Sequence, residues 1–203
     1  MKIKICGMGS PENIMEVAAL QPDYLGFIFF EKSARDFKGT IPNLPESIIK
    51  TGVFVDATFE FVVEKINQYN FGAVQLHGAE SPEYCQKIKA LGVEIIKVFS
   101  IKNDFDFSRL DPYKSYVNYF LFDTKGEQPG GNGFVFDWKV LNNYNSEIPF
   151  ILSGGIGLNE IEAIKEIRSS DLPVYAIDLN SKFEIEPAEK DVGILKEFLN
   201  NIK

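Results

Sequence analysis

The chain alternates short strand-like runs with segments of helical periodicity from its first residues to its last. The strand candidates are β-branched or aromatic runs, eight in number: residues 3–6, 24–29, 52–55, 73–76, 95–99, 119–123, 150–153 and 174–178. Strands that alternate with helices form βαβ units, in which the strands lie parallel and the crossovers are right-handed. A closed (β/α)8 barrel, the TIM barrel, satisfies such a pattern most simply. We expect residues 1–203 to form one such barrel as a single α/β domain.

Helix starts are marked in several of the connections. Ser10-Pro11 and Ser81-Pro82 each place a capping serine before a proline, which is typical of a helix N-terminus. Apolar residues at spacings of three and four predict further helices within 59–69, 158–167 and 192–202. The connections after the second, fifth and sixth strands have weaker patterns, and prolines interrupt them. We therefore expect a small barrel with some short or irregular helices.

An open, doubly wound sheet is the alternative fold. Such a sheet would usually carry a GxGxxG motif after its first strand, whereas here Gly7-Met8-Gly9 is followed by Ser10-Pro11-Glu12. In a barrel, the chemistry lies at the C-terminal ends of the strands. Reactive residues at those ends are therefore the site candidates.

Composition excludes several classes of function. The net charge of -8 opposes binding to nucleic acid, because lysine and arginine supply most of the affinity for phosphate backbones. No run approaches the roughly 18 to 20 apolar residues of a membrane helix, and the N-terminus lacks the apolar core of a secretory signal. The two cysteines, Cys6 and Cys85, form no CxxC pair. We expect a cytoplasmic protein with no metal site that binds neither nucleic acid nor membrane.

Two strand ends carry candidates for proton transfer. Cys6 closes the first strand and Gly7 follows it, so its thiol would project into the barrel mouth as a base or nucleophile. Asp123 ends the sixth strand after an apolar run in which a carboxylate is expensive to bury without a role. A thiol and a carboxyl group that face each other suit proton transfer at two substrate atoms. Cys85 lies on the apolar stripe of a helix and is assigned to the core.

Three further side chains at strand ends are candidates for substrate binding. Arg35, just beyond the second strand, has the planar fork that holds carboxylates, although a solvated loop charge is equally consistent with its position. His77 closes the fourth strand and could contact substrate. Asp178 ends the eighth strand, where a purely structural hydrogen-bonding role fits as well.

Glycine clusters predict an anion site. One cluster, Gly130-Gly131-Asn132-Gly133, follows the sixth strand, and the other, Ser153-Gly154-Gly155-Ile156-Gly157, follows the seventh. Backbone amides approach an anion closely only where side chains are missing. Loops after the seventh and eighth strands are the usual phosphate site of this fold, so the second cluster indicates phosphate binding.

With these residues in place, the chain resembles the phosphoribosylanthranilate isomerase family along its whole length. The motifs that carry the resemblance are Lys4-Ile5-Cys6-Gly7, Gly26-Phe27-Ile28-Phe29 with Ser33-Ala34-Arg35, Gly52-Val53-Phe54-Val55, Gln75-Leu76-His77-Gly78, Asp123-Thr124-Lys125 with Gly130-Gly131-Asn132-Gly133 and Phe136-Asp137-Trp138, and Leu152-Ser153-Gly154-Gly155-Ile156. The resemblance implies an Amadori rearrangement of N-(5-phosphoribosyl)anthranilate in L-tryptophan biosynthesis. It also implies that neither a metal nor an organic cofactor takes part.

The resemblance also implies roles for the candidates. Cys6 would be the general base and Asp123 the general acid, while Arg35 would hold the anthranilate carboxylate. The substrate-binding set comprises Arg35, His77, Gly131, Gly133, Gly154, Gly155, Asp178, Asn180 and Ser181. Many members of the family carry an Asp-Val-Ser-Ser-Gly type sequence after the eighth strand, whereas this chain has Asp178-Leu179-Asn180-Ser181-Lys182, without the glycine. We hypothesise that Lys182 adds charge at the phosphate.

Two other readings stay open from the residues alone. Another phosphosugar barrel, such as indole-glycerol-phosphate synthase or a histidine-pathway isomerase, would need a catalytic lysine on an early strand or an aspartate at the position of Cys6. A catalytically silent phosphate-binding barrel would be expected to lack Cys6, Asp123 or Arg35, and all three are present. The expected partner is a small phosphosugar, and the expected assembly is a monomer or a homodimer.

Overall fold

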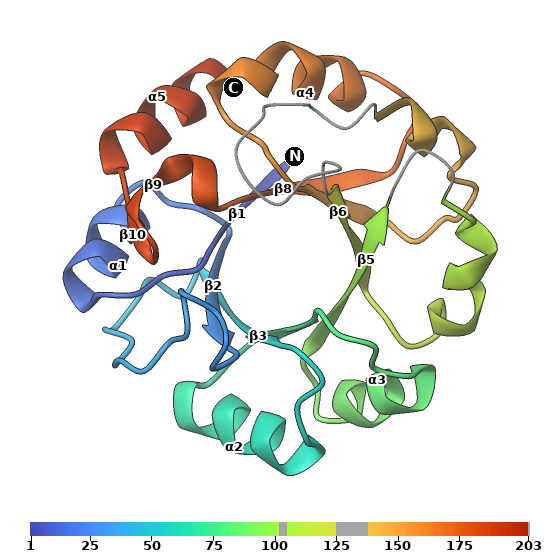
Figure 1. The fold of residues 1–203 in the computed structure, drawn as a ribbon, viewed down its shortest axis with the longest axis horizontal. Helices are drawn as coiled ribbons and strands as arrows, with labels where there is room; N and C mark the ends of the chain where they lie inside the picture. Colours follow the sequence, from blue (N-terminus) through green and yellow to red (C-terminus); the bar gives the residue numbers. More distant parts are fainter. Residues whose placement is uncertain (102–104, 125–137, 203) are drawn as a thin grey trace.

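The computed structural model describes residues 1–101, 105–124 and 138–202, and at its centre is a closed barrel of parallel strands (Figure 1). The barrel strands are β1 (Lys2–Cys6), β2 (Tyr24–Phe29), β3 (Ile49–Phe54), β4 (Ala73–Leu76), β5 (Glu94–Ile101), β6 (Tyr119–Thr124), β7 (Phe150–Ser153) and β8 (Val174–Leu179). The barrel closes because β1 pairs with both β2 and β8, so that Lys4 lies in register with Tyr24 on one side and Asp178 on the other. The predicted (β/α)8 barrel is confirmed.

In the part of the chain that the structure describes, five α-helices surround the barrel (Figure 1). They are α1 (Pro11–Ala18), α2 (Phe59–Tyr69), α3 (Pro82–Lys89), α4 (Ile161–Arg168) and α5 (Val192–Ile202). The Ser10 hydroxyl accepts from the amide of Asn13 at 3.3 Å, and the Ser81 hydroxyl accepts from that of Tyr84 at 3.2 Å. These bonds satisfy amides that a helix leaves unpaired in its first turn, so the two predicted N-termini are confirmed.

The connections expected to be short or irregular are so wherever the structure describes them, which leaves out residues 102–104 after β5 and 125–137 after β6. Residues 30–48, all of which the structure describes, contain no helix after β2. After β5 the chain forms a 3₁₀ helix at Phe107–Tyr113 that contains Pro112, and after β6 another at Trp138–Asn143. Proline lacks the amide donor that an α-helix needs at each interior position, which accounts for the 3₁₀ form at Pro112.

A hairpin follows β8 that the sequence did not predict. A 3₁₀ turn at Ser181–Phe183 leads into β9 (Glu184–Glu186), which pairs antiparallel with β10 (Glu189–Lys190). Strands of two or three residues are too short to show a hydrophobic period. The hairpin lies beside β1 and α1 (Figure 1). Its charged residues contact residues of the site described below.

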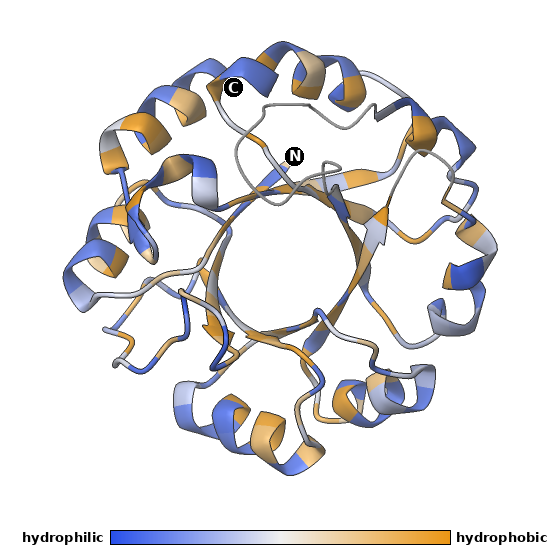
Figure 2. Ribbon diagram, viewed as in Figure 1, coloured by the Kyte–Doolittle hydropathy of each residue, from blue (hydrophilic) through white to orange (hydrophobic). Residues whose placement is uncertain are grey.

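The hydrophobic core has two parts. The larger part lies between the barrel and its helices and includes Cys85, which is fully buried on α3, as predicted. The smaller part fills the barrel interior and consists of Tyr24, Ala73, Ile96, Val98, Leu121, Ile151 and Ala176. The strands are largely hydrophobic, whereas the helices combine apolar and hydrophilic positions (Figure 2). Toward the C-terminal strand ends the interior becomes polar, which is where a site can form.

Candidate active site

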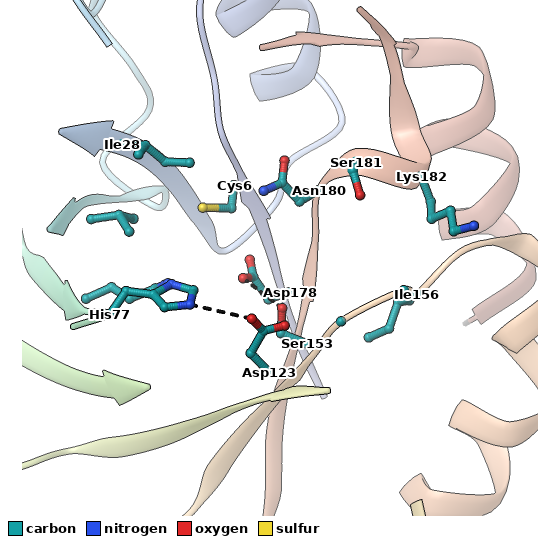
Figure 3. Close-up of a pocket in the computed structure, with 14 residues that line it drawn as sticks. Cys6, Ile28, His77, Asp123, Ser153, Ile156, Asp178, Asn180, Ser181 and Lys182 are labelled. Atoms are coloured by element: carbon teal, nitrogen blue, oxygen red, sulfur yellow. Dashed lines mark hydrogen bonds and ion pairs between the residues drawn. The ribbon is translucent and has the colours of Figure 1, made fainter. Parts of the chain in front are cut away.

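A pocket of about 300 Å³ opens at the C-terminal ends of the barrel strands (Figure 3). This volume is at the lower end of the roughly 300–1,000 Å³ typical of small-molecule sites. The pocket is lined by Cys6, Ile28, Val53, Gln75, His77, Asp123, Ser153, Gly154, Gly155, Ile156, Asp178, Asn180, Ser181 and Lys182. The two predicted catalytic residues therefore share one pocket, together with most of the predicted binding residues.

Cys6 reaches the pocket from the end of β1. The amides of Gly7 and Met8 both donate to the carbonyl oxygen of Gly26, at 3.0 and 3.1 Å, which holds the chain in a tight turn behind the cysteine. A β-carbon at Gly26 would stand 2.8 Å from the Cys6 sulfur, closer than packed atoms allow. The absence of a side chain at Gly26 thus gives the sulfur its position.

The Cys6 thiol is 3% exposed and sits among charges of both signs. Burial raises the pKa of the thiol, the Lys4 ammonium lowers it, the Asp178 carboxylate raises it, and Lys190 lowers it; the net direction is upward. Thiolate formation therefore depends on the balance among these neighbours.

Lys4 and Asp178 form a buried ion pair next to Cys6. Nζ of Lys4 lies 2.8 Å from Oδ1 of Asp178, and the two side chains are 0% and 5% exposed. The Ser153 hydroxyl donates to the other Asp178 oxygen at 3.4 Å. The sequence analysis included Asp178 but missed Lys4. A usable signal was present, because side chains two positions apart on a strand share a face and Lys4 stands two before Cys6.

Asp123 enters the pocket from β6 and faces His77 (Figure 3). Nε2 of His77 lies 3.5 Å from Oδ2 of Asp123, and the Gln75 side-chain amide donates to Nδ1 of His77 at 3.3 Å. The carbonyl oxygen of Gln75 is buried and has no hydrogen-bond partner among the described residues. His77 is thus in contact with the candidate acid, and Gln75, which the sequence analysis did not select, supports it.

The predicted glycine turn after β7 forms another wall. Gly154 and Gly155 have φ values of +95° and +68°, which L side chains rarely adopt, and a β-carbon at Gly155 would meet nothing within 4 Å. Backbone and open space therefore face the pocket there, beside Ser181 and Lys182. The amide of the next glycine, Gly157, donates to the Glu160 carboxylate at 2.7 Å. Gly131 and Gly133, also predicted to bind substrate, lie outside the described residues.

Arg35 lies next to the pocket rather than in its lining. Its Cδ would be 2.9 Å from a β-carbon at Gly7, and its guanidinium is held by the Glu184 carboxylate of β9, with Nε bonds of 2.8 and 3.0 Å and an Nη2 bond of 2.6 Å. This pairing raises the pKa of Arg35. Lys190 of β10 donates to the same carboxylate at 2.6 Å and to the predicted binding residue Asn180 at 2.7 Å. Glu184 and Lys190 were not predicted as site residues, because both belong to the hairpin that was not predicted.

Within residues 1–101, 105–124 and 138–202, no group of three or more His, Cys, Asp or Glu side chains is arranged to hold a metal ion. No helix in these same segments has the length and apolar character needed to cross a membrane.

Comparison with known proteins gives a consistent result. The family model described as N-(5'phosphoribosyl)anthranilate (PRA) isomerase matches residues 3–201. The N-(5'-phosphoribosyl)anthranilate isomerase of Parabacteroides distasonis is 47% identical over 210 residues, which cover 100% of this chain and 93% of that protein. The crystal structure of phosphoribosyl anthranilate isomerase from Thermotoga maritima superposes with a TM-score of 0.85 at 31% identity, covering 100% of this chain and 98% of the other.

A further crystal structure shows a phosphoribosyl anthranilate isomerase in complex with reduced 1-(o-carboxyphenylamino)-1-deoxyribulose 5-phosphate. It superposes with a TM-score of 0.82 at 28% identity, again covering 100% of this chain and 98% of the other. The similarity thus extends over the whole barrel. This chain belongs to the N-(5'-phosphoribosyl)anthranilate isomerase family.

Proposed function

We propose that this chain converts N-(5-phosphoribosyl)anthranilate into 1-(2-carboxyphenylamino)-1-deoxyribulose 5-phosphate, a step of L-tryptophan biosynthesis. The observation that carries the proposal is the meeting of the Cys6 thiol and the Asp123 carboxyl group in one pocket with the glycine turn of β7. Family membership supports the substrate, as does the related isomerase crystallised with a reduced form of this product.

The chemistry needs one acid and one base. Asp123 donates a proton to the furanose ring oxygen, the ring opens, and the nitrogen lone pair forms an iminium at C1. The iminium acidifies the proton on C2, which the Cys6 thiolate removes to give an enolamine. Tautomerisation of the enolamine yields the ketone. Because these steps move protons within one substrate and are redox neutral, we propose neither a metal nor an organic cofactor.

Binding of the two charged ends of the substrate is assigned to opposite parts of the mouth. Backbone amides around Gly154 and Gly155, together with Asn180 and Ser181, would hold the phosphate. Gly131 and Gly133 are assigned to the same role by the family motif. The anthranilate carboxylate would bind Arg35 through Nη1, which has no hydrogen-bond partner among the described residues. Glu184 would then orient the Arg35 guanidinium through Nε and Nη2, and Nη1 of the same guanidinium would bind the substrate carboxylate.

His77 is assigned to the site through its contact with Asp123, and Asp178 through its place in the pocket wall. We propose that the protein works in the cytoplasm, as a monomer or a homodimer, on this small phosphosugar.

The loss of anthranilate fluorescence tests the function. With N-(5-phosphoribosyl)anthranilate generated in situ, the wild-type protein should consume it, whereas Cys6→Ala and Asp123→Asn should lower turnover by about 10² or more, the scale of a lost positioned acid or base. Cys85→Ala is the matched control, because this thiol is buried on α3 and outside the pocket, and it should keep wild-type turnover. Near-normal turnover in either pocket variant contradicts its assigned role.

A further inference from the structure

Among the described residues, Lys4 and Asp178 form a charged pair inside the barrel. A contribution to stability does not by itself explain why this pair is buried. Lys4 and Asp178 project inward from adjacent strands, 2.8 Å apart and nearly inaccessible to water. The other described interior side chains are mainly apolar, such as Ile96 and Leu121, and the buried Gln75 of the pocket wall is uncharged. Removing two charges from water costs several kcal/mol per ion, and a buried pair is often no more stabilising than apolar residues of similar size. A role in the chemistry is the alternative explanation.

The pair lies against the proposed base. Lys4 and Cys6 share one face of β1, and Asp178 lines the same pocket as Cys6. Burial alone would lower the pKa of Lys4, but the Asp178 carboxylate and the Cys6 sulfur outweigh it and raise the pKa. Lys4 therefore stays charged between two groups that interact with its ammonium, the Asp178 carboxylate and the Cys6 sulfur, and the sulfur becomes anionic only when the thiol ionises.

The remaining charges around Cys6 are already shared among themselves. Lys190 and Arg35 both act on the thiol electrostatically, yet both donate to the Glu184 carboxylate, which offsets their charge. Across the pocket, His77 and Asp123 pair with each other, and the ammonium-bearing Lys182 also lines the wall beside Ser181. Among the described residues, Lys4 and Asp178 are thus the buried ion pair that interacts with the Cys6 thiol and involves no contact with Glu184.

We propose that Lys4 and Asp178 are positioning residues that set how readily the Cys6 thiol ionises, with Lys4 favouring the thiolate and Asp178 limiting it. This inference rests on the proposed function, in which Cys6 first takes a proton from C2 and must then release it. A base works best when its proton affinity is matched to the operating pH. Lys4 alone would hold the thiolate too firmly, and Asp178 alone would suppress it.

The two charges predict opposite effects on one measurable quantity. In a Cys85→Ala background, alkylation of Cys6 by iodoacetamide is followed against pH, with the modified site quantified by mass spectrometry. Lys4→Met should slow alkylation at pH 7 by about tenfold, the change in thiolate fraction that one neighbouring charge produces. Asp178→Asn should accelerate it by a similar factor, because the thiolate becomes the remaining anionic partner of Lys4. The double variant should fall between the two.

A merely structural pair would behave differently, since loss of either partner would loosen the site and change alkylation in the same direction. Equal or same-sign changes in the two single variants therefore overturn the proposal. If Lys4→Met does not fold, as judged by circular dichroism, Asp178→Asn alone decides, and unchanged or slower alkylation overturns it. The rising limb of kcat/KM against pH should move up in Lys4→Met and down in Asp178→Asn.

Alkylation separates this inference from the proposed function. Opposite shifts in alkylation with no isomerase activity in the wild-type protein would leave the charge pair standing and remove the isomerase. If isomerase activity depends on Cys6 but alkylation is unchanged in both variants, the isomerase stands and the proposed role of the charge pair is overturned.

Discussion

The position of the Cys6 sulfur depends on a side chain that is missing. A β-carbon at Gly26 would lie 2.8 Å from this sulfur and 3.1 Å from the cysteine Cα, so an alanine there must displace the thiol or the strand. We expect Gly26→Ala to lower turnover by about 10-fold to 10²-fold, since a displacement near 1 Å can cost that much. Steady-state assay of turnover checks this. Gly193→Ala on α5, remote from the pocket, is the control, and full activity in folded Gly26→Ala would contradict the packing constraint.

Lys182 lines the pocket together with Gly154 and Gly155 of the glycine turn. If its ammonium contacts the substrate phosphate, Lys182→Ala should raise KM by about tenfold, the effect of a lost charged hydrogen bond of ~1.5 kcal/mol, with kcat little changed. The exposed Lys196 on α5 provides a control of equal charge. An unchanged KM would remove Lys182 from the phosphate site.

Among the elements, the β9–β10 hairpin contributes two charged residues, Glu184 and Lys190, that contact Arg35 and Asn180 at the site. Glu184, 5% exposed, accepts from Arg35 and Lys190, and Lys190 is itself fully buried. Glu184→Gln should therefore destabilise the protein by about 3 kcal/mol, because a buried lysine loses its anionic partner. Urea unfolding at pH 7 measures this loss.

The same hairpin predicts a pH dependence of stability. Burial would raise the pKa of Glu184, but hydrogen bonds from Arg35 and Lys190 outweigh it and hold the pKa below its ordinary value of 4.5. The contribution of Glu184 is therefore complete above pH 4.5 and is lost as the pH falls through the lower, folded-state value. The difference in unfolding free energy between wild type and Glu184→Gln should shrink on acidification below pH 4.5. A difference that is constant from pH 7 to pH 3 would contradict this account.

In the molecule as a whole, the two ends of the barrel differ: one end holds the pocket, and the other holds a cluster of tyrosines. The end opposite the pocket is closed by tyrosines: the Tyr24 hydroxyl donates to Glu94 at 2.9 Å and shares a 2.9 Å bond with the Tyr175 hydroxyl, while Tyr119 stacks on Tyr175 with centroids 4.1 Å apart. These residues lie at the N-terminal strand ends, where a barrel carries stability rather than chemistry.

Tyr24→Phe should therefore separate stability from activity. Loss of its hydroxyl removes hydrogen bonds to the half-buried Glu94 and Tyr175 and should lower the unfolding free energy by about 1 kcal/mol, with kcat and KM unchanged. Denaturant unfolding and steady-state kinetics on the same preparation check both parts. Tyr116→Phe is the control, since this hydroxyl makes no hydrogen bond to another described residue. A fall in turnover in Tyr24→Phe would show that the barrel ends are coupled.

The barrel could be predicted from local patterns in the chain, and so could the two pocket residues Cys6 and Asp123 as candidates. Alternating strand and helix periods and the Ser10 and Ser81 caps are local signals, readable without knowing what packs against what. Cys6 and Asp123 could be selected for the same reason, because each stands at the end of a segment with a local strand pattern.

The charged side chains that surround Cys6 could not be predicted in this way, because their contacts depend on the tertiary structure. Lys4 and Asp178 are 174 positions apart and meet because β1 and β8 close the barrel in a particular register. Arg35 and Glu184 are 149 positions apart and meet through a hairpin too short to leave a periodic pattern. Periodicity is set by neighbours along the chain, whereas an ion pair depends on which residues strand register and loop packing bring within a few ångströms. The ionisation of the Cys6 thiol is therefore a property of the closed barrel.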